Sequence, residues 1–276
     1  MTIQTALVQG TKLLEEGRIG APRLTAEVLL ACALRRERAY LYAHPEEELR
    51  EVAWIHYGRY LHERLNGKPT QYITGRQEFY GREFRVTRDV LIPRPETEHL
   101  VEAALTRIRA GDVVLDIGTG SGAIAVTLAL ETGARVLATD ISLAALCVAR
   151  SNAQRLSARV AFVACDLAAC IADRTIDVLV SNPPYVPASD QASIQREVRD
   201  WEPHVALFAG PTGLAIYERL IVEARRVLRP GGWLLLELGY NSVEPVRAML
   251  QSGWGELTVA QDLAGLPRLL AARLLP

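Results

Sequence analysis

The stretch VLDIGTGSGAIAV, residues 114–126, decides the fold. An apolar run ends in Asp116 and Ile117, three glycines follow in a G-x-G-x-G spacing, and a helical pattern begins directly after them. Glycine allows a tight turn and lets backbone N–H groups approach a ligand closely. Dinucleotide-binding turns use the spacing G-x-G-x-x-G instead. The stretch therefore predicts a buried strand, a ligand-binding turn and a helix, with a ligand other than a dinucleotide.

The same rhythm of strands and helices continues along the chain. Short apolar runs alternate with helical patterns such as SLAALCVARSNAQRL, and the runs occupy residues 113–117, 136–139, 160–164, 178–180 and 233–238. Strands that crossover helices cover on both faces have such continuous apolar runs. The stretch GELTVAQDLAGLPRLLAARLL adds two strand-like runs around a turn. We predict an α/β fold with a doubly wound, mostly parallel, Rossmann-like sheet and an antiparallel hairpin at its edge.

A small all-helical domain is predicted ahead of this sheet, over residues 1–69. The stretch APRLTAEVLLACALRR has a proline suited to a first helical turn, and REVAWIHYGRYLHERLNG repeats the helical pattern. The predicted apolar faces hold Leu24, Val28, Leu29 and Leu34 in the first stretch, and Val52, Ile55, Tyr60 and Leu61 in the second. Residues 70–88 are rich in aromatic and β-branched side chains, which predicts a β-hairpin linker. Residues 89–276 then form the sheet domain.

Composition limits the partners and the compartment. The 276 residues are 49% hydrophobic and 23% charged, and the net charge of −1 gives no general attraction to nucleic acid. No apolar run approaches the roughly 20 residues of a membrane span, and the N-terminus lacks a signal-peptide pattern. Cys32, Cys147, Cys165 and Cys170 form no C-x-x-C pair. We therefore expect reduced core thiols, no metal site, no membrane partner and a cytoplasmic location.

Carboxylates end the successive predicted strands. Asp140 lies 22 positions after Gly118, and a carboxylate at about that distance typically accepts hydrogen bonds from ribose hydroxyls. Asp166 ends the next run and is placed to receive an adenine amino group, while Asp116 suits a ligand with an amino group or a positive charge. A single aspartate of this kind is often only a helix N-cap. Three of them in order predict S-adenosyl-L-methionine as the cofactor, because ligands bind at the carboxyl ends of parallel strands.

The stretch VLVSNPPYVP, residues 178–187, predicts a clamp for a planar nitrogen. Its prolines fix φ and remove N–H donors, so that carbonyl groups are free to face a substrate. The carbonyls of Asn182 and a proline can both accept from one NH2 group, and Tyr185 can stack on its plane. Such a clamp holds an amine or amide nitrogen in line with a methyl sulfonium. The alternative is a rigid turn after a strand without a chemical role.

Four segments carry a resemblance to a known family: LIPRPETE (91–98), LDIGTGSGAIAV (115–126), SNPPYV (181–186) and EPHVALFAGPTGLAIY (202–217). With the helical domain ahead of them, the chain resembles the bacterial peptide chain release factor glutamine methyltransferases, the PrmC/HemK family, over essentially its whole length. N-P-P-Y alone is shared with DNA adenine-N6 and other exocyclic-amine methyltransferases. It indicates a chemistry, and the combination indicates the family.

The resemblance implies a class I methyltransferase fold and a protein-glutamine N-methyltransferase that converts S-adenosyl-L-methionine to S-adenosyl-L-homocysteine. The implied substrate is the glutamine in the Gly-Gly-Gln motif of class 1 peptide chain release factors, methylated on its side-chain amide nitrogen, N5. Residues 1–69 would recognise the release factor body. We also expect a monomer without direct nucleic-acid contact.

The predicted site residues follow from these patterns and from the resemblance. The catalytic and substrate-binding residues are Asn182, Pro183, Pro184 and Tyr185, and the resemblance adds Arg94 and Glu96 as substrate-binding residues. The cofactor-binding residues are Asp116, Gly118, Thr119, Gly120, Ser121, Gly122, Asp140, Ile141, Asp166, Leu167 and Asn182. Leu167 departs from the family pattern, in which an aromatic residue often lies beside the adenine.

Two other functions compete with this interpretation. An adenine-N6 DNA or ribosomal RNA methyltransferase has the same clamp, but it is expected to carry clustered Lys and Arg in a recognition region. Residues 1–69 instead interleave ten Lys or Arg with nine Glu. A catalytically silent adenosine-binding adaptor predicts a broken clamp, whereas residues 182–185 are intact.

Overall fold

Two compact units make up the chain in the computed structural model, which describes residues 1–239, 241–262 and 265–276. The first unit holds residues 1–76 and 195–201, and the second holds residues 77–194 and 202–276. None of the helices within the described ranges combines the length and the apolar character that crossing a bilayer requires.

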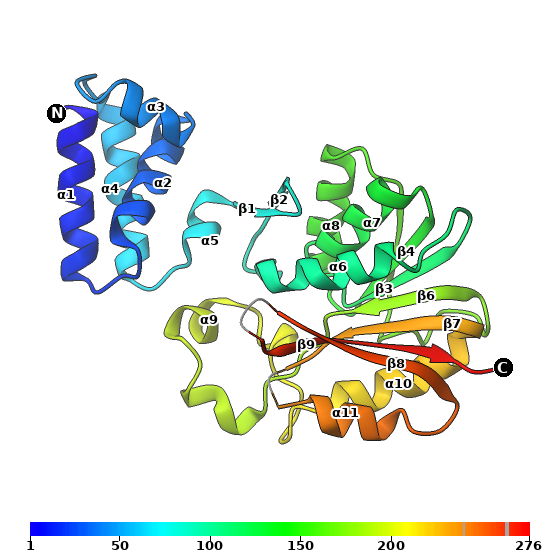
Figure 1. Ribbon diagram of the computed structural model, residues 1–276. Coiled ribbons are helices and arrows are strands. Elements are labelled where there is room, and N and C mark those ends of the chain that lie inside the picture. Colours follow the sequence, from blue (N-terminus) through cyan, green and yellow to red (C-terminus); the bar gives the residue numbers. More distant parts are fainter. Residues whose placement is uncertain (240, 263–264) are drawn as a thin grey trace. The chain divides into compact units, whose positions relative to one another are not determined.

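The first unit is built from helices (Figure 1). These are α1 (Ile3–Glu16), α2 (Pro22–Leu34), α3 (Arg38–Ala43), α4 (Glu51–Leu65), α5 (Thr70–Thr74) and α9 (Arg196–Trp201). Helix α1 begins where the Thr2 hydroxyl accepts a hydrogen bond from the Thr5 N–H at 3.2 Å, which satisfies one unpaired donor of the first turn. The core contains Ile3, Leu14 and Tyr57, all fully buried. The predicted helical domain is thus confirmed.

The apolar faces predicted for two of these helices are partly wrong. In α2, Leu29 and Leu30 are buried, but Leu24 is 45% exposed. In α4, Val52 and Ile55 are 66% and 58% exposed, whereas Ala53, Tyr57 and Leu61 form the buried face at a spacing of four residues. Both helices carry apolar residues on more than one side, so their sequences alone do not indicate which side turns inward.

Helix α9 comes from a distant part of the sequence but belongs to the first unit. Arg64 of α4 donates to the Glu197 carboxylate at 2.5 Å, and the Lys68 ammonium lies 5.9 Å from the centre of the Trp201 ring. Residues 195–201 therefore leave the second unit, pack in the first, and return to the second at Glu202.

A two-stranded hairpin, β1 (Arg76–Phe79) and β2 (Arg82–Arg85), begins at the last residue of the first unit and lies otherwise in the second. Tyr80 and Gly81 form its turn with φ of +51° and +68°. Positive φ at both central residues is the type I′ geometry, which matches the twist of the flanking strands. Phe79 and Phe84 are buried edge to face, with ring centres 6.1 Å apart.

The second unit contains a seven-stranded sheet with the order β5-β4-β3-β6-β7-β9-β8. Its strands are β3 (Val113–Ile117), β4 (Arg135–Asp140), β5 (Val160–Ala164), β6 (Ile176–Ser181), β7 (Leu228–Glu237), β8 (Trp254–Gln261) and β9 (Pro267–Leu274). Pairing is parallel from β5 to β7, and antiparallel at β7–β9 and β8–β9. The predicted Rossmann-like sheet with an antiparallel edge hairpin is confirmed. The turn predicted for that hairpin falls on residues 263–264, which lie outside the described residues.

Helices cover both faces of this sheet (Figure 1). On one face lie α6 (Glu98–Leu105), α7 (Ala123–Thr132) and α8 (Leu143–Arg155). The short helix η1 (Pro95–Thr97) directly precedes α6. On the other face lie α10 (Ala215–Val227) and α11 (Val243–Met249), while η2 (Ala188–Ala192) and η3 (His204–Ala206) lie in the connection after β6. The strand order reverses between β3 and β6, and sheets of this kind bind ligands outside the carboxyl ends of the strands at that point.

The cysteines are free, as predicted, but they do not lie in the core. Cys147 and Cys170 are exposed, and Cys32 and Cys165 are half-buried. The prediction of core thiols is therefore wrong: Cys147 lies on an exposed side of α8 and Cys170 on the loop after β5, while Cys32 in α2 and Cys165 at the cavity are only partly covered.

Candidate active site

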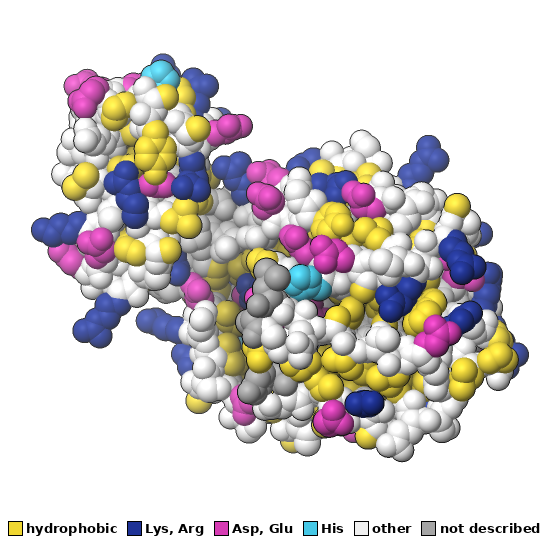
Figure 2. Space-filling view, viewed as in Figure 1, with side chains coloured by type: hydrophobic (Ala, Val, Ile, Leu, Met, Phe, Trp, Pro, Cys, Tyr) yellow, Lys and Arg dark blue, Asp and Glu magenta, His cyan; other side chains and the backbone are white. Residues whose placement is uncertain are grey.

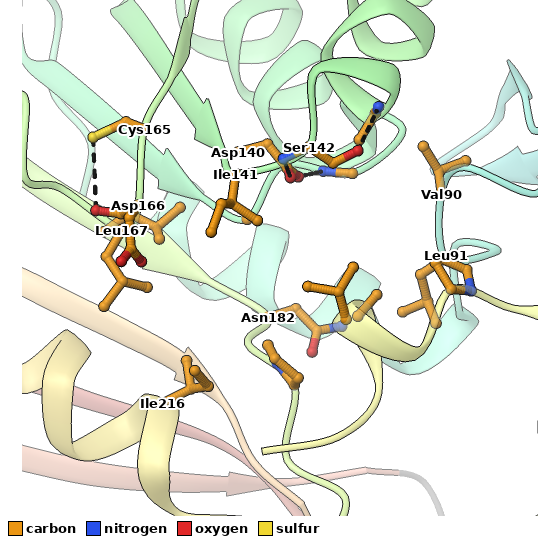
Figure 3. A pocket seen from close by; sticks show the side chains of 18 of the residues that line it. Val90, Leu91, Asp140, Ile141, Ser142, Cys165, Asp166, Leu167, Asn182 and Ile216 are labelled. Atoms are coloured by element: carbon orange, nitrogen blue, oxygen red, sulfur yellow. Dashed lines mark hydrogen bonds between the residues drawn. The ribbon is translucent and has the colours of Figure 1, made fainter. Parts of the chain in front are cut away.

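A cavity of about 170 Å³ opens at the carboxyl ends of the parallel strands, beside the reversal between β3 and β6. The glycine turn, the ends of β4 and β5 and the loop after β6 contribute Gly118, Gly120, Asp140, Ile141, Asp166, Leu167, Asn182 and Pro184 to its lining. Val90, Leu91 and Ile216 contribute from other segments (Figure 3). The topology thus brings predicted cofactor residues and predicted substrate residues into one cavity.

The glycine turn needs glycine for two separate reasons. Gly118 and Gly120 have φ of +74° and +54°, in the left-handed region that other residues rarely adopt. Gly122 has φ +82°, and a Cβ atom there would lie 3.1 Å from the Ala149 Cβ in α8. The first pair lines the cavity, while Gly122 allows α7 and α8 to pack closely.

Asp140 is oriented by the backbone before any ligand binds. Its Oδ2 accepts from the Gly120 N–H at 2.9 Å, and its Oδ1 accepts from the Ser142 N–H at 2.8 Å. Each carboxylate oxygen has two lone pairs, so each retains the capacity to accept from a ligand hydroxyl. This carboxylate therefore fits the predicted contact with a ribose.

Asp116 lies behind the cavity rather than in its wall. It is fully buried, and neither carboxylate oxygen has a hydrogen-bond partner of good geometry among the described residues. Burial raises its pKa to about 7, against smaller lowering effects from the Thr119 hydroxyl and the Ala125 N–H. Thr119, Ser121 and Gly122 are also absent from the described lining. Direct contact of these four residues with a cofactor stays a prediction.

The loop after β5 closes one side of the cavity. The Thr139 hydroxyl donates to the Leu167 carbonyl at 2.8 Å, which ties this loop to β4. The Asp166 carboxylate accepts from Arg219 of α10 at 2.6 Å, and both side chains are about half exposed. An exposed pair of this kind contributes little to stability and leaves the carboxylate accessible. Asp166 can therefore exchange this partner for a ligand.

Asn182 reaches the cavity from the end of β6. The preceding Ser181 hydroxyl donates to the Ile117 carbonyl at 2.8 Å, which joins β6 to β3. Asn182 Nδ2 donates to the Thr97 hydroxyl oxygen at 3.1 Å. Figure 3 shows the Asn182 side chain between Leu91 on one side and Leu167 and Ile216 on the other.

The other members of the predicted clamp lie at different places. Pro184 lines the cavity with Asn182, whereas Pro183 and Tyr185 are not in its described lining. Tyr185 packs against the core below the sheet, and a Cβ atom on Gly239 would lie 2.9 Å from its ring. Burial, followed by the Glu237 carboxylate, raises the pKa of Tyr185 to about 12. Stacking of Tyr185 on a substrate stays a prediction.

The segment LIPRPETE lies beside the cavity, but its polar residues have different partners. Arg94 forms an ion pair with Glu202, whose side chain is 1% exposed and also accepts from the Ile92 N–H at 3.2 Å. Glu96 is exposed. Thr97 is the residue of this segment that hydrogen-bonds to Asn182. Substrate contacts of Arg94 and Glu96 stay predictions.

Three polar residues around this site were not predicted from the sequence: Thr97, Glu202 and Glu237. Thr97 donates to the Glu237 Oε2 at 2.6 Å, and both side chains are buried. Glu237 ends the apolar run WLLLE on the same edge of the sheet as Asp140. A carboxylate at the end of a buried strand was a usable signal there, as it was for Asp140.

Comparison with known proteins assigns the class of the sheet-bearing unit. Residues 96–199 match the family model described as the methyltransferase small domain. A methyltransferase from Pyrococcus furiosus has the same fold with a TM-score of 0.53 and 21% identity, over 71% of this chain and 90% of that one. The chain therefore has the fold of the Rossmann-like methyltransferases, a class that uses S-adenosylmethionine.

Comparison over the full length then gives the family. Residues 5–75 match the model of the PrmC N-terminal domain. A release factor glutamine methyltransferase from Koribacter versatilis is 46% identical over 99% of both chains. Another from Nitratidesulfovibrio vulgaris is 41% identical over 99% of this chain and 95% of the other. The chain belongs to the release factor glutamine methyltransferase family.

Proposed function

We propose that this protein transfers a methyl group from S-adenosyl-L-methionine to N5 of the glutamine side chain in the Gly-Gly-Gln motif of class 1 peptide chain release factors. The observation that carries the proposal is that Asn182 and Pro184 line the same cavity as Asp140 and Asp166. The residues proposed to hold the substrate nitrogen and those suited to bind an adenosine therefore line the same cavity. Family membership supports the choice of a glutamine amide over a nucleic-acid base.

The residues present fit the cofactor. Both oxygens of Asp140 are oriented and can accept further hydrogen bonds. At Gly118 an added Cβ atom would meet nothing within 4 Å, so the backbone at this point borders open space. When bound, S-adenosylmethionine supplies an electrophilic methyl group on a positively charged sulfur. We propose that Asp116, Gly118, Thr119, Gly120, Ser121, Gly122, Asp140, Ile141, Asp166, Leu167 and Asn182 form the cofactor site.

The proposed role of Asn182 is to hold the substrate amide in line for attack. Its Nδ2 donates to Thr97, so its Oδ1 is the end that can accept from the glutamine NH2 group. An amide lone pair is delocalised and weakly nucleophilic, and fixing its orientation lowers the barrier without a strong base. Asp140 and Asp166 would hold the cofactor while Asn182 holds the amide. The amide nitrogen would then take the methyl carbon, the sulfur would keep the electron pair of the broken carbon–sulfur bond, and an amide proton would leave to solvent. The products are N5-methylglutamine and S-adenosyl-L-homocysteine.

The remaining substrate contacts are proposals that rest on the chain order around the cavity. Pro183, Pro184 and Tyr185 follow Asn182 directly and would border the substrate glutamine, with Arg94 and Glu96 at the cavity's edge. Residues 1–69 would recognise the release factor body, residues 70–88 would link the units, and residues 89–276 would carry the chemistry. Figure 2 shows basic and acidic side chains interspersed on the visible face of the helical unit, which suits a protein partner better than a phosphate backbone. We propose a cytoplasmic monomer.

Mass spectrometry of a class 1 release factor incubated with this protein and isotope-labelled S-adenosylmethionine tests the proposal. One labelled methyl group is expected on the glutamine of the Gly-Gly-Gln motif. The matched control is a release factor with alanine at that glutamine, which should acquire no label. Label on adenine of added DNA or ribosomal RNA, with none on the release factor, would overturn the proposed substrate.

A further inference from the structure

Three side chains from different elements form a hydrogen-bonded row at the end of the cavity. Asn182 Nδ2 donates to Thr97 Oγ1 at 3.1 Å, and Thr97 Oγ1 donates to Glu237 Oε2 at 2.6 Å. Thr97 and Glu237 are 5% and 3% exposed and are absent from the described lining of the cavity. The contact that links them to the cavity is therefore the hydrogen bond from Asn182 to Thr97.

The direction of each hydrogen bond follows from the ionised carboxylate. An ionised carboxylate only accepts, so the single hydroxyl proton of Thr97 points to Glu237. Thr97 Oγ1 then offers only lone pairs to Asn182, which must turn its NH2 group toward Thr97. The two ends of an asparagine amide have nearly the same shape, so packing alone does not choose between them.

We infer that Thr97 and Glu237 are positioning residues that fix the orientation of the Asn182 amide, with Oδ1 directed at the substrate nitrogen. This inference deepens the proposed function and rests on it for the identity of that nitrogen. With the amide turned over, an NH2 group of Asn182 would face an NH2 group of the substrate. Two donors cannot hydrogen-bond to each other, so the reversed amide would not hold the substrate in line.

Protonation of Glu237 would release the amide. A protonated carboxyl can donate to Thr97 Oγ1, which frees the Thr97 proton to donate to Asn182 Oδ1 and so permits the reversed orientation. Burial raises the pKa of Glu237 to about 7, although a hydrogen bond from Thr97, the charge of Arg268 and the nearby Asn182 amide lower it. The groups that face Glu237 are Glu96 and Thr97 of η1, Asn182 and Tyr185 after β6, Tyr217 of α10 and Arg268 of β9. A single orientation of the Asn182 amide is therefore no longer enforced once the pH falls below about 7.

Single-turnover methylation of the release factor across neutral pH tests the inference in the parent and three variants. The parent rate should fall on the acid side of about 7. Thr97→Val keeps the shape but removes the hydroxyl, and should lower the rate about tenfold on the alkaline side and abolish the acid fall. Thr97→Ser, which keeps the hydroxyl, should restore both the alkaline-side rate and the fall on the acid side. Glu237→Gln, which can both donate and accept, should give a lowered rate without the acid fall.

The matched control is Thr127→Val. Thr127 lies in α7, is fully buried, and its hydroxyl has no partner among the described residues. The same chemical change there should leave the rate and its pH dependence at parent values. Circular dichroism at each pH separates loss of orientation from unfolding.

A second measurement does not depend on activity. The side-chain NH2 signal of Asn182 in a ¹⁵N spectrum, assigned by its absence in Asn182→Ala, should move with the protonation of Glu237 in the parent and stay fixed in Glu237→Gln. A fixed signal in the parent overturns the inference, as do parent kinetics in Thr97→Val or an acid fall that persists in Glu237→Gln. A parent that transfers no methyl group at any pH rejects the proposed function instead, and the NH2 signal still decides the orientation.

Discussion

Replacing Gly122 by alanine tests how closely the cofactor turn depends on helix packing. Gly122 has φ +82°, and its N–H donates to the Thr119 carbonyl at 2.8 Å within the glycine turn. An added Cβ atom would lie 3.1 Å from the Cβ and 3.2 Å from the Cα of Ala149. Since backbone atoms cannot rotate away, α7 and α8 would have to separate.

The magnitude follows from two contributions. Holding alanine at positive φ costs about 1 kcal/mol relative to glycine, and forcing extra volume into a packed contact adds about 1–3 kcal/mol. The expected loss in the free energy of unfolding is therefore about 2–4 kcal/mol. Gly133→Ala is the matched control: its φ is +65° at the other end of α7, and its Cβ would meet nothing within 4 Å. That variant should lose only about 1 kcal/mol.

Urea unfolding of both variants measures these losses, and calorimetry with S-adenosylhomocysteine measures the effect on the turn. Gly122→Ala should bind the ligand more weakly, because the start of α7 carries the turn that lines the cavity, and Gly133→Ala should bind it as the parent does. Equal losses of stability in the two variants would refute the packing argument.

Four further outcomes are expected. Asn182→Ala should lower the single-turnover methylation rate by about 100-fold or more while release-factor binding, measured separately, is kept; near-parent rates would mean that the turn after β6 has no chemical role. S-adenosylmethionine or its demethylated product should raise the melting temperature and NAD should not; a shift with NAD alone contradicts the cofactor assignment. Glu202→Ala leaves the Ile92 N–H and the Arg94 guanidinium without this partner and should reduce the free energy of unfolding by about 2 kcal/mol, whereas an unchanged urea midpoint rejects the anchoring role. Burial raises the pKa of Asp116 from 3.8 to about 7, so the folded chain binds this proton more tightly and the free energy of unfolding should fall as the pH rises through that interval. The free energy of unfolding of Asp116→Asn should therefore increase relative to that of the parent as the pH rises. A difference between the two that does not change with pH argues against the raised pKa.

The strands and their ends were predictable because burial on both faces leaves a plain signal. Residues 113–117 and 160–164 match β3 and β5 at both ends. Asp140 could be placed in the site because a parallel strand brings its last residue to a common edge. The alternation of strands and helices along the chain is sufficient to place such a residue.

Side-chain partnerships across the fold were not predictable in the same way. Thr97 and Glu237 are 140 positions apart and meet only because η1 lies against the end of β7. Tyr185 follows Asn182 by three residues, yet the turn directs it into the core rather than the cavity lining. Leu24 and Val52 were predicted to be buried but are exposed. The sequence did not decide this, because a helix with apolar residues on several sides has no unique inward direction.

The return of residues 195–201 to the first unit limits how the two units can be exchanged by recombination. The chain passes between its two units three times, at 76/77, 194/195 and 201/202. A single genetic junction can therefore not exchange the helical unit for another, because α9 would remain behind without Arg64 and Lys68. A recombination that gave this fold a new recognition unit would have to replace α9 together with residues 1–76. Otherwise the new unit would need its own partners for Glu197 and Trp201 of α9.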